Sequence, residues 1–148
     1  MTSERERVDY LFTGGTIVTM DEERRLVENG AIAVRGQDIV GVGPADELQA
    51  RYEAGETVDC TGKAIMPGFI NSHTHAPMTL LRGLADDLRL DVWLMGYMIP
   101  VEREFVSPEF VRLGTKLACA EMIKGGTTCF ADMYYFEHDI AEATAEAG

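Results

Sequence analysis

The sequence contains little cysteine, the residue that forms disulfide bonds and thiolate metal sites. Only three of its 148 residues are cysteine, namely Cys60, Cys119 and Cys129. Their number is odd and no Cys-x-x-Cys spacing occurs, which argues against a disulfide framework and against a cysteine zinc site. We therefore expect buried free thiols in a reducing compartment.

Basic residues are also scarce. Thirteen lysines and arginines face 25 acidic residues, so the formal net charge is −12. Binding to nucleic acid needs a basic face, and anionic membranes repel such a chain, so we expect neither partner. No apolar run approaches the ~20 residues that span a bilayer. Residues 1–7 are charged and lack the apolar core of a secretory signal, which predicts a cytoplasmic location.

Residues 1–66 predict a small β-rich domain without a catalytic cluster of its own. Short strand-like segments alternate here with turn signals rich in glycine and acidic residues. We expect one hairpin about Gly14-Gly15 and a second about Gly36-Gln37-Asp38. The expected elements are strands at 8–12, 16–19, 31–34, 39–42, Val58 and 64–66, and a helix at 45–53.

The pattern changes at Pro67, where a second domain, residues 67–148, is expected. An apolar strand at 67–75 is followed by a long irregular stretch, 76–106. Ser107-Pro108 predicts a helix start and Gly125-Gly126 its end. The apolar face expected for this helix is Phe110, Leu113 and Leu117, widened by Ala118 and Met122. A buried strand at 127–134 and a helix at 138–147 follow. This order predicts the start of a parallel α/β fold. A closed (β/α)8 barrel needs about 250 residues, so residues 67–148 would form only its beginning.

The apolar strand ends in His73-Thr74-His75. Residues i and i+2 of a strand share a face, so both imidazoles can reach one ion. A catalytic zinc takes about three protein ligands and a water, whose pKa it lowers to ~7. The resulting hydroxide could attack C6 of a purine and expel ammonia. Two histidines are too few for this, and His138, among acidic neighbours at a helix start, is expected at the surface.

Three segments together resemble the amidohydrolase superfamily. They are 67–75, PGFINSHTH; 78–87, MTLLRGLADD; and 125–134, GGTTCFADMY. The similarity is greater to its 5′-methylthioadenosine/S-adenosylhomocysteine deaminase branch, which has chlorohydrolase relatives. The resemblance implies an α/β fold. Residues 1–66 would be the N-terminal half of a composite β-sandwich, and 67–148 the first two β/α units of a (β/α)8 TIM barrel, incomplete in this chain.

The resemblance also implies site residues. His73 and His75 would be ligands of a single divalent metal ion, with zinc first and iron or manganese as alternatives. Glu102 would bind the ribose hydroxyls, against the alternative of a solvated loop glutamate. Trp93 would stack on the purine, against the alternative of plain core packing. No catalytic acid or base is matched, since the branch's further histidines, His-x-x-Glu and last aspartate would lie beyond Gly148. The stretch 95–98 differs from the sequence expected in this branch, so the resemblance does not define the pocket wall or the exact substrate.

The function expected from this resemblance is hydrolytic deamination of a small-molecule purine nucleoside, 5′-methylthioadenosine or S-adenosylhomocysteine, through a zinc-activated hydroxide. Alternatives within the superfamily are a chlorohydrolase, a guanine deaminase or another amidohydrolase. Two further alternatives are a non-catalytic truncated fragment, aggregation-prone and inactive by itself, and a fragment that pairs with a separate chain. Assembly of the full-length protein into a homo-oligomer is a further alternative.

Overall fold

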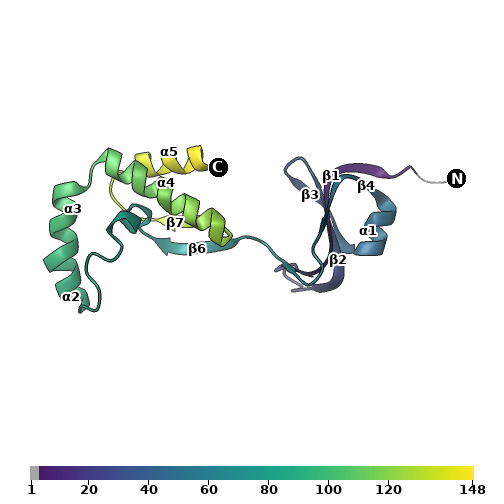
Figure 1. Cartoon of the computed structure of the whole chain (residues 1–148), viewed down its shortest axis with the longest axis horizontal. Helices are drawn as coiled ribbons and strands as arrows, with labels where there is room; N and C mark the ends of the chain where they lie inside the picture. Colours follow the sequence, from purple (N-terminus) through teal and green to yellow (C-terminus); the bar gives the residue numbers. More distant parts are fainter. Residues whose placement is uncertain (1–3) are drawn as a thin grey trace. The chain divides into compact units, whose positions relative to one another are not determined.

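The chain divides into two structural units between Pro67 and Gly68. The computed structural model describes residues 4–148. Each unit has its own sheet and its own covering helices (Figure 1). In the first unit, the strand order is β3-β2-β1-β4, and β5 pairs with the far end of β1. Its elements are β1 (Glu6–Val18), β2 (Leu26–Arg35), β3 (Asp38–Pro44), α1 (Ala45–Arg51), β4 (Tyr52–Asp59) and β5 (Ala64–Ile65).

The core of the first unit lies between the sheet and α1. Alternate residues of β2, Ala31 and Ala33, point inward as in a half-buried strand. They meet two residues of β1 and two of the helix. The Tyr52 ring is buried among them, and its hydroxyl donates a hydrogen bond of 3.0 Å to the carbonyl of Val40. The buried cluster comprises Val8, Leu11, Ala31, Ala33, Ala45, Leu48 and Tyr52.

The predicted hairpin at Gly14-Gly15 is wrong. Both glycines lie inside the single strand β1, where the register against β2 shifts on either side of Gly15. Gly14 has a φ of +84°, which suits a bulge that a side chain would strain. The reversal comes later, where Thr19 N–H donates to the Arg25 carbonyl at 3.1 Å. There the Arg25 guanidinium lowers the pKa of Asp21 to about 2. The predicted hairpin about Gly36 is confirmed, because β2 and β3 pair antiparallel across it.

The second unit is built on two parallel strands. These are β6 (Phe69–Thr74) and β7 (Thr127–Asp132), with Phe69 opposite Thr127 and Thr74 opposite Asp132. Helices α4 (Pro108–Gly125) and α5 (Glu137–Ala147) lie next to each other over this pair (Figure 1). The strand β7 was expected to be buried, but its residues are half-buried or exposed.

The stretch 76–106 is more helical than the sequence pattern predicts. It begins with a 3-10 turn, η1 (Ala76–Leu81). After a short irregular segment, three helical pieces follow one another without a break: α2 (Leu90–Val92), η2 (Trp93–Met98) and α3 (Ile99–Phe105). The middle piece is π-helical, a geometry that is rare and often found at functional sites.

Helix α4 begins and ends as predicted, but of its predicted apolar face only Ala118 is fully buried. The Ser107 hydroxyl accepts from the Phe110 N–H at 3.2 Å, and Gly126 closes the helix in the left-handed region with a φ of +81°. Leu113 and Leu117 are exposed, whereas smaller residues face inward. The buried residues are Val111, Gly114, Thr115, Ala118 and Cys119. Small side chains allow η1 to approach the helix closely.

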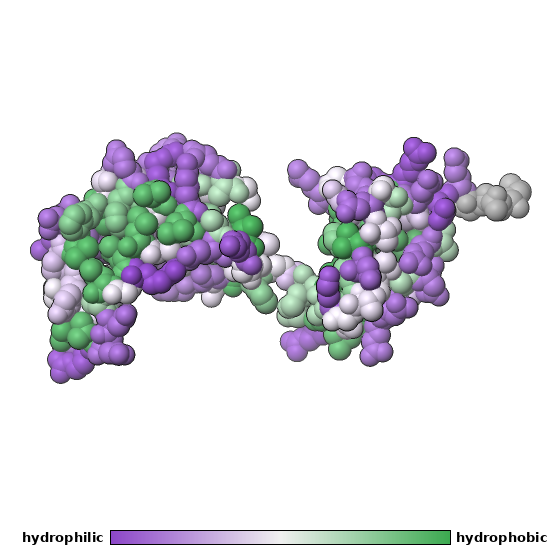
Figure 2. Space-filling model, in the orientation of Figure 1, coloured by the Kyte–Doolittle hydropathy of each residue, from purple (hydrophilic) through white to green (hydrophobic). Residues whose placement is uncertain are grey.

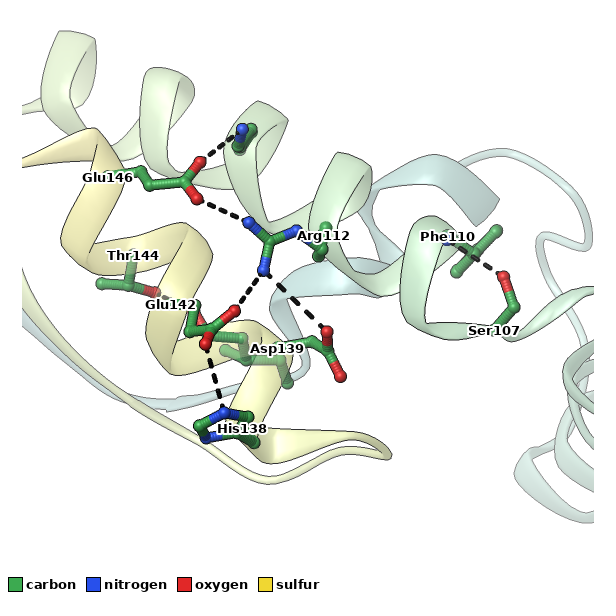
Figure 3. Close-up of polar contacts among 10 residues, drawn as sticks. Ser107, Phe110, Arg112, His138, Asp139, Glu142, Thr144 and Glu146 are labelled. Atoms are coloured by element: carbon green, nitrogen blue, oxygen red, sulfur yellow. Dashed lines mark hydrogen bonds and ion pairs between the residues drawn. The ribbon is translucent and has the colours of Figure 1, made fainter.

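An ion-pair network joins α4 to α5 (Figure 3). The Arg112 guanidinium contacts Glu142 at 2.6 Å and Glu146 at 2.5 Å, and Lys116 contacts Glu146 at 2.6 Å. The Lys116 ammonium and Arg112 hold the pKa of Glu146 below its ordinary value. One arginine thus bridges two carboxylates on successive turns of α5.

Apolar side chains remain at the surface of the second unit. Figure 2 shows them gathered on one face over α3 and the adjoining part of α4. Phe105, Leu113 and Leu117 are exposed on these helices, as are Phe69 and Ile70 on β6. Between residues 4 and 148, no helix combines the length and apolar character needed to cross a membrane.

The described cysteines are free thiols. Cys60 and Cys119 are buried, as expected, whereas Cys129 is exposed.

The approach of η1 to α4 yields a stability prediction. A Cβ on Gly114 would lie 2.5 Å from the Pro77 carbonyl oxygen, and Pro77 is itself fully buried. Gly114→Ala should therefore destabilise the protein by about 1–3 kcal/mol. The matched control is Gly125→Ala in the same helix, where a Cβ meets nothing within 4 Å. It should stabilise by up to about 1 kcal/mol. Thermal melts of the complete gene product check this, and equal melting temperatures for the two variants would contradict it.

Candidate functional site

The candidate site forms where β6 and β7 end. Thr74 pairs with Asp132, so the residues that follow them come together although 58 positions separate His75 from Met133. The carboxyl ends of parallel strands share one edge of a sheet, and ligands of α/β proteins bind at that edge. The backbone pairing therefore places His75 beside the segment Met133 to Tyr135.

The two histidines of the His-x-His pair lie close together. Their ring centroids are 5.0 Å apart and the ring planes are inclined by 80°. His73 is exposed and His75 half-buried. The register of β6 against β7 shifts between Asn71 and Thr74, so this end of the strand is irregular. The Asn71 side-chain oxygen accepts from the His73 N–H at 3.3 Å within that irregular turn.

One ring nitrogen of His75 is already engaged by the backbone. Its Nδ1 lies 2.6 Å from the carbonyl oxygen of Met133. A carbonyl can only accept a hydrogen bond, so Nδ1 must carry the proton. The Nε2 lone pair of the neutral ring is then free, which is the usual arrangement of a metal-binding histidine held by an outer partner.

Asp132 holds the backbone around His75. Its Oδ2 accepts from the Ala76 N–H at 3.0 Å and its Oδ1 from the Met133 N–H at 2.7 Å. Burial raises the pKa of Asp132, although both backbone hydrogen bonds oppose this shift. The Asp132 carboxylate thus links the backbone of Ala76 to that of Met133, whose carbonyl contacts the His75 ring.

A cavity of about 420 Å³ opens beside these residues. Most of its wall is apolar, and a few polar groups converge on it, as in small-molecule sites. The structure brings three of the predicted residues, His75, Trp93 and Glu102, to this one cavity, whereas His73 is not part of its lining. The remaining lining residues are Met78, Leu94, Met133, Tyr134 and Tyr135.

The Tyr134 hydroxyl donates a hydrogen bond of 2.9 Å to Oε1 of Glu102. Burial and this hydrogen bond raise the pKa of Tyr134 well above its ordinary value, so the phenol stays protonated at neutral pH. Sequence reasoning assigned no role to Tyr134. The available signal was its place two residues after the second strand, next to Met133, which follows β7 as His75 follows β6.

Two imidazoles suit part of a zinc ligand set but do not complete it. Within residues 4–148, no group of three or more histidine, cysteine, aspartate or glutamate side chains is placed to hold a metal ion. A catalytic zinc takes about three protein ligands. His138 cannot contribute, because its side chain is 86% exposed and pairs with Glu142 on α5. This exposure confirms the prediction of a surface histidine.

A model described as the amidohydrolase family matches residues 64–148, more than half of the chain. The chain belongs to the amidohydrolase family. The residues matched include both strands of the second unit and every residue of the cavity. The family expected from the sequence is thus confirmed, and with it the α/β fold class.

Individual relatives point to one branch of the amidohydrolases. A protein of Syntrophus aciditrophicus named 5-methylthioadenosine/S-adenosylhomocysteine deaminase 1 is 49% identical over 97% of this chain. The crystal structure of an adenosine deaminase from Xanthomonas campestris with bound zinc aligns with a TM-score of 0.91 and 43% identity, covering 97% of this chain and 33% of that one. Atrazine chlorohydrolase from Arthrobacter aurescens, also with zinc, aligns at 0.75 and 26% identity, covering 93% and 32%. The chain spans about a third of the length of the curated relatives it matches.

The Met133 contact predicts the tautomer of His75. In the metal-free gene product, the neutral His75 ring should carry its proton on Nδ1, because the facing carbonyl can only accept. Long-range proton–nitrogen NMR spectra of the histidine side chains distinguish the two tautomers. His75→Gln assigns the His75 signal, and His138→Gln assigns the exposed ring as a reference. A neutral His75 protonated on Nε2 would contradict the geometry.

Proposed function

We propose that the protein is a metal-dependent hydrolytic deaminase of an adenosine-type purine nucleoside, 5′-methylthioadenosine or S-adenosylhomocysteine. The observation that carries the proposal is the single cavity in which His75, Trp93 and Glu102 meet. These residues supply a metal-ligand type, a flat aromatic surface and a hydrogen-bond acceptor. Relatives 49% and 43% identical carry the names of deaminases of such nucleosides.

His73 and His75 would hold one divalent metal ion, zinc in the first instance. The free Nε2 of His75 and the 5.0 Å separation of the two rings fit this role. Zinc is present in the Xanthomonas adenosine deaminase structure. When bound, the metal supplies an activated water for hydrolysis at neutral pH. The part of this chain in the chemistry would be to hold the two ligand rings.

Glu102 and Trp93 would bind the substrate. A carboxylate oxygen can accept hydrogen bonds from a ribose diol, and those to a charged acceptor are stronger than neutral ones. The indole of Trp93 can stack on a purine, and its place in the cavity wall favours this role over plain core packing. We assign no acid–base role within residues 4–148.

The two units correspond to two proposed domains. Residues 1–66 would contribute to a β-sandwich domain, and residues 67–148 would form the first two β/α units of a barrel. The break between Pro67 and Gly68 and the parallel pairing of β6 with β7 support this division.

The activity is tested on the complete gene product loaded with zinc. Ammonia release and the ultraviolet change on conversion of the adenine ring to hypoxanthine should appear with 5′-methylthioadenosine or S-adenosylhomocysteine. A protein that binds zinc yet leaves both nucleosides unchanged, while releasing chloride from a chlorotriazine or ammonia from guanine, would contradict the proposal in favour of a related amidohydrolase.

The three histidines allow a controlled test of the metal site. His73→Ala and His75→Ala should each weaken zinc binding by more than about 100-fold, since loss of outer-shell partners alone costs about 10–100-fold. Competition with a chromophoric chelator measures this affinity without any assay of activity. His138→Ala removes an exposed imidazole and should leave the affinity unchanged. Equal affinities for all three variants would place the metal elsewhere.

A further inference from the structure

Glu102 has a single side-chain partner among residues 4–148. Its Oε1 accepts the 2.9 Å hydrogen bond from the Tyr134 hydroxyl, and no other side chain within that range donates to the carboxylate. The other oxygen, Oε2, is left for a ligand, and Glu102 lines the cavity. A free glutamate side chain samples several rotamers, and ordering one on binding costs free energy. A donor that holds one oxygen beforehand removes part of that cost.

Tyr134 is itself held at its backbone and contacted at its ring. Its backbone N–H donates to the Glu137 carboxylate at the start of α5. Its ring centroid lies 5.1 Å from that of Tyr135 and 6.2 Å from that of His75. The Tyr134 ring therefore lies near the histidine of the proposed metal site, while its hydroxyl contacts the carboxylate on α3.

We propose that Tyr134 is a positioning residue, which orients the Glu102 carboxylate so that its free oxygen receives the vicinal hydroxyls of the substrate's sugar. This role rests on the proposed function. It adds the feature that sets the selectivity for a ribonucleoside over a deoxy analogue. Tyr134 acts through Glu102 and not on the reacting base. Its loss should therefore affect recognition of the diol alone.

The test compares two substrates in the complete, zinc-loaded gene product. These are 5′-methylthioadenosine and its 2′,3′-dideoxy analogue, which lacks the hydroxyls. Tyr134→Phe removes one oxygen atom and keeps the ring. It should lower kcat/KM for the ribonucleoside about tenfold, mainly through KM, because the released Glu102 side chain must then be ordered when the substrate binds. The value for the dideoxy analogue should stay that of the wild type.

A double-mutant cycle separates positioning from a second, independent effect. With the ribonucleoside, Tyr134→Phe should cost nothing further once Glu102→Ala is present, because both changes remove the same interaction. Tyr10→Phe is the matched control: it removes a phenol oxygen from an exposed ring on β1 and should match the wild type. The zinc content of Tyr134→Phe should be unchanged, and its melting temperature should fall by no more than a few degrees, as expected for the loss of one hydrogen bond.

Four results would overturn the proposal. Equal losses on both substrates would mean that Tyr134 supports the fold or acts at the base. Independent, multiplying losses in the double variant would mean that it does not act through Glu102. A wild-type protein that turns over neither nucleoside would overturn the proposed function and this role together, whereas an active wild type with an unaltered Tyr134→Phe variant would overturn the positioning role alone.

Discussion

The parallel pairing of β6 with β7 is the constraint on which the site depends. It sets Thr74 opposite Asp132 and so brings two distant chain segments to one edge. The last residue of β7 and the two residues that follow it then each contact one part of the site. Asp132 accepts from the Ala76 N–H, the Met133 carbonyl holds the His75 ring, and Tyr134 holds Glu102. A slip of the pairing by one residue would misplace all three contacts.

The site combines a rigid side and a side with unusual backbone geometry. On the rigid side, α4 approaches η1 closely because Gly114 lies against Pro77. On the other side, Trp93 and Glu102 come from a continuous helical run that contains a π-helical segment. Glu102 lies in α3, which follows the π segment directly. The contact from Tyr134 to Glu102 links this run to β7.

Sequence reasoning succeeded where local chemistry decides structure. The cap of Ser107, the turn after Arg35 and the His-x-His at a strand end all follow from nearby residues. It failed where tertiary contacts decide. Leu113 and Leu117 follow an apolar period, yet α4 buries its small residues, because close approach to η1 and α5 needs small side chains. Gly14-Gly15 has the composition of a turn, but pairing with β2 on one side and β4 and β5 on the other keeps it within one strand. The Tyr134–Glu102 contact joins residues 32 positions apart and has no local signature.

The central claim is that the ends of β6 and β7 hold a metal through His73 and His75 beside a nucleoside cavity. The most direct measurement is an anomalous difference map at the zinc edge from crystals of the complete gene product grown with zinc. The account predicts a peak bonded to both imidazoles, with His75 ligating through Nε2 while its Nδ1 keeps the Met133 carbonyl. A peak that touches neither ring, or a His75 that has left Met133 to bind through Nδ1, would contradict it.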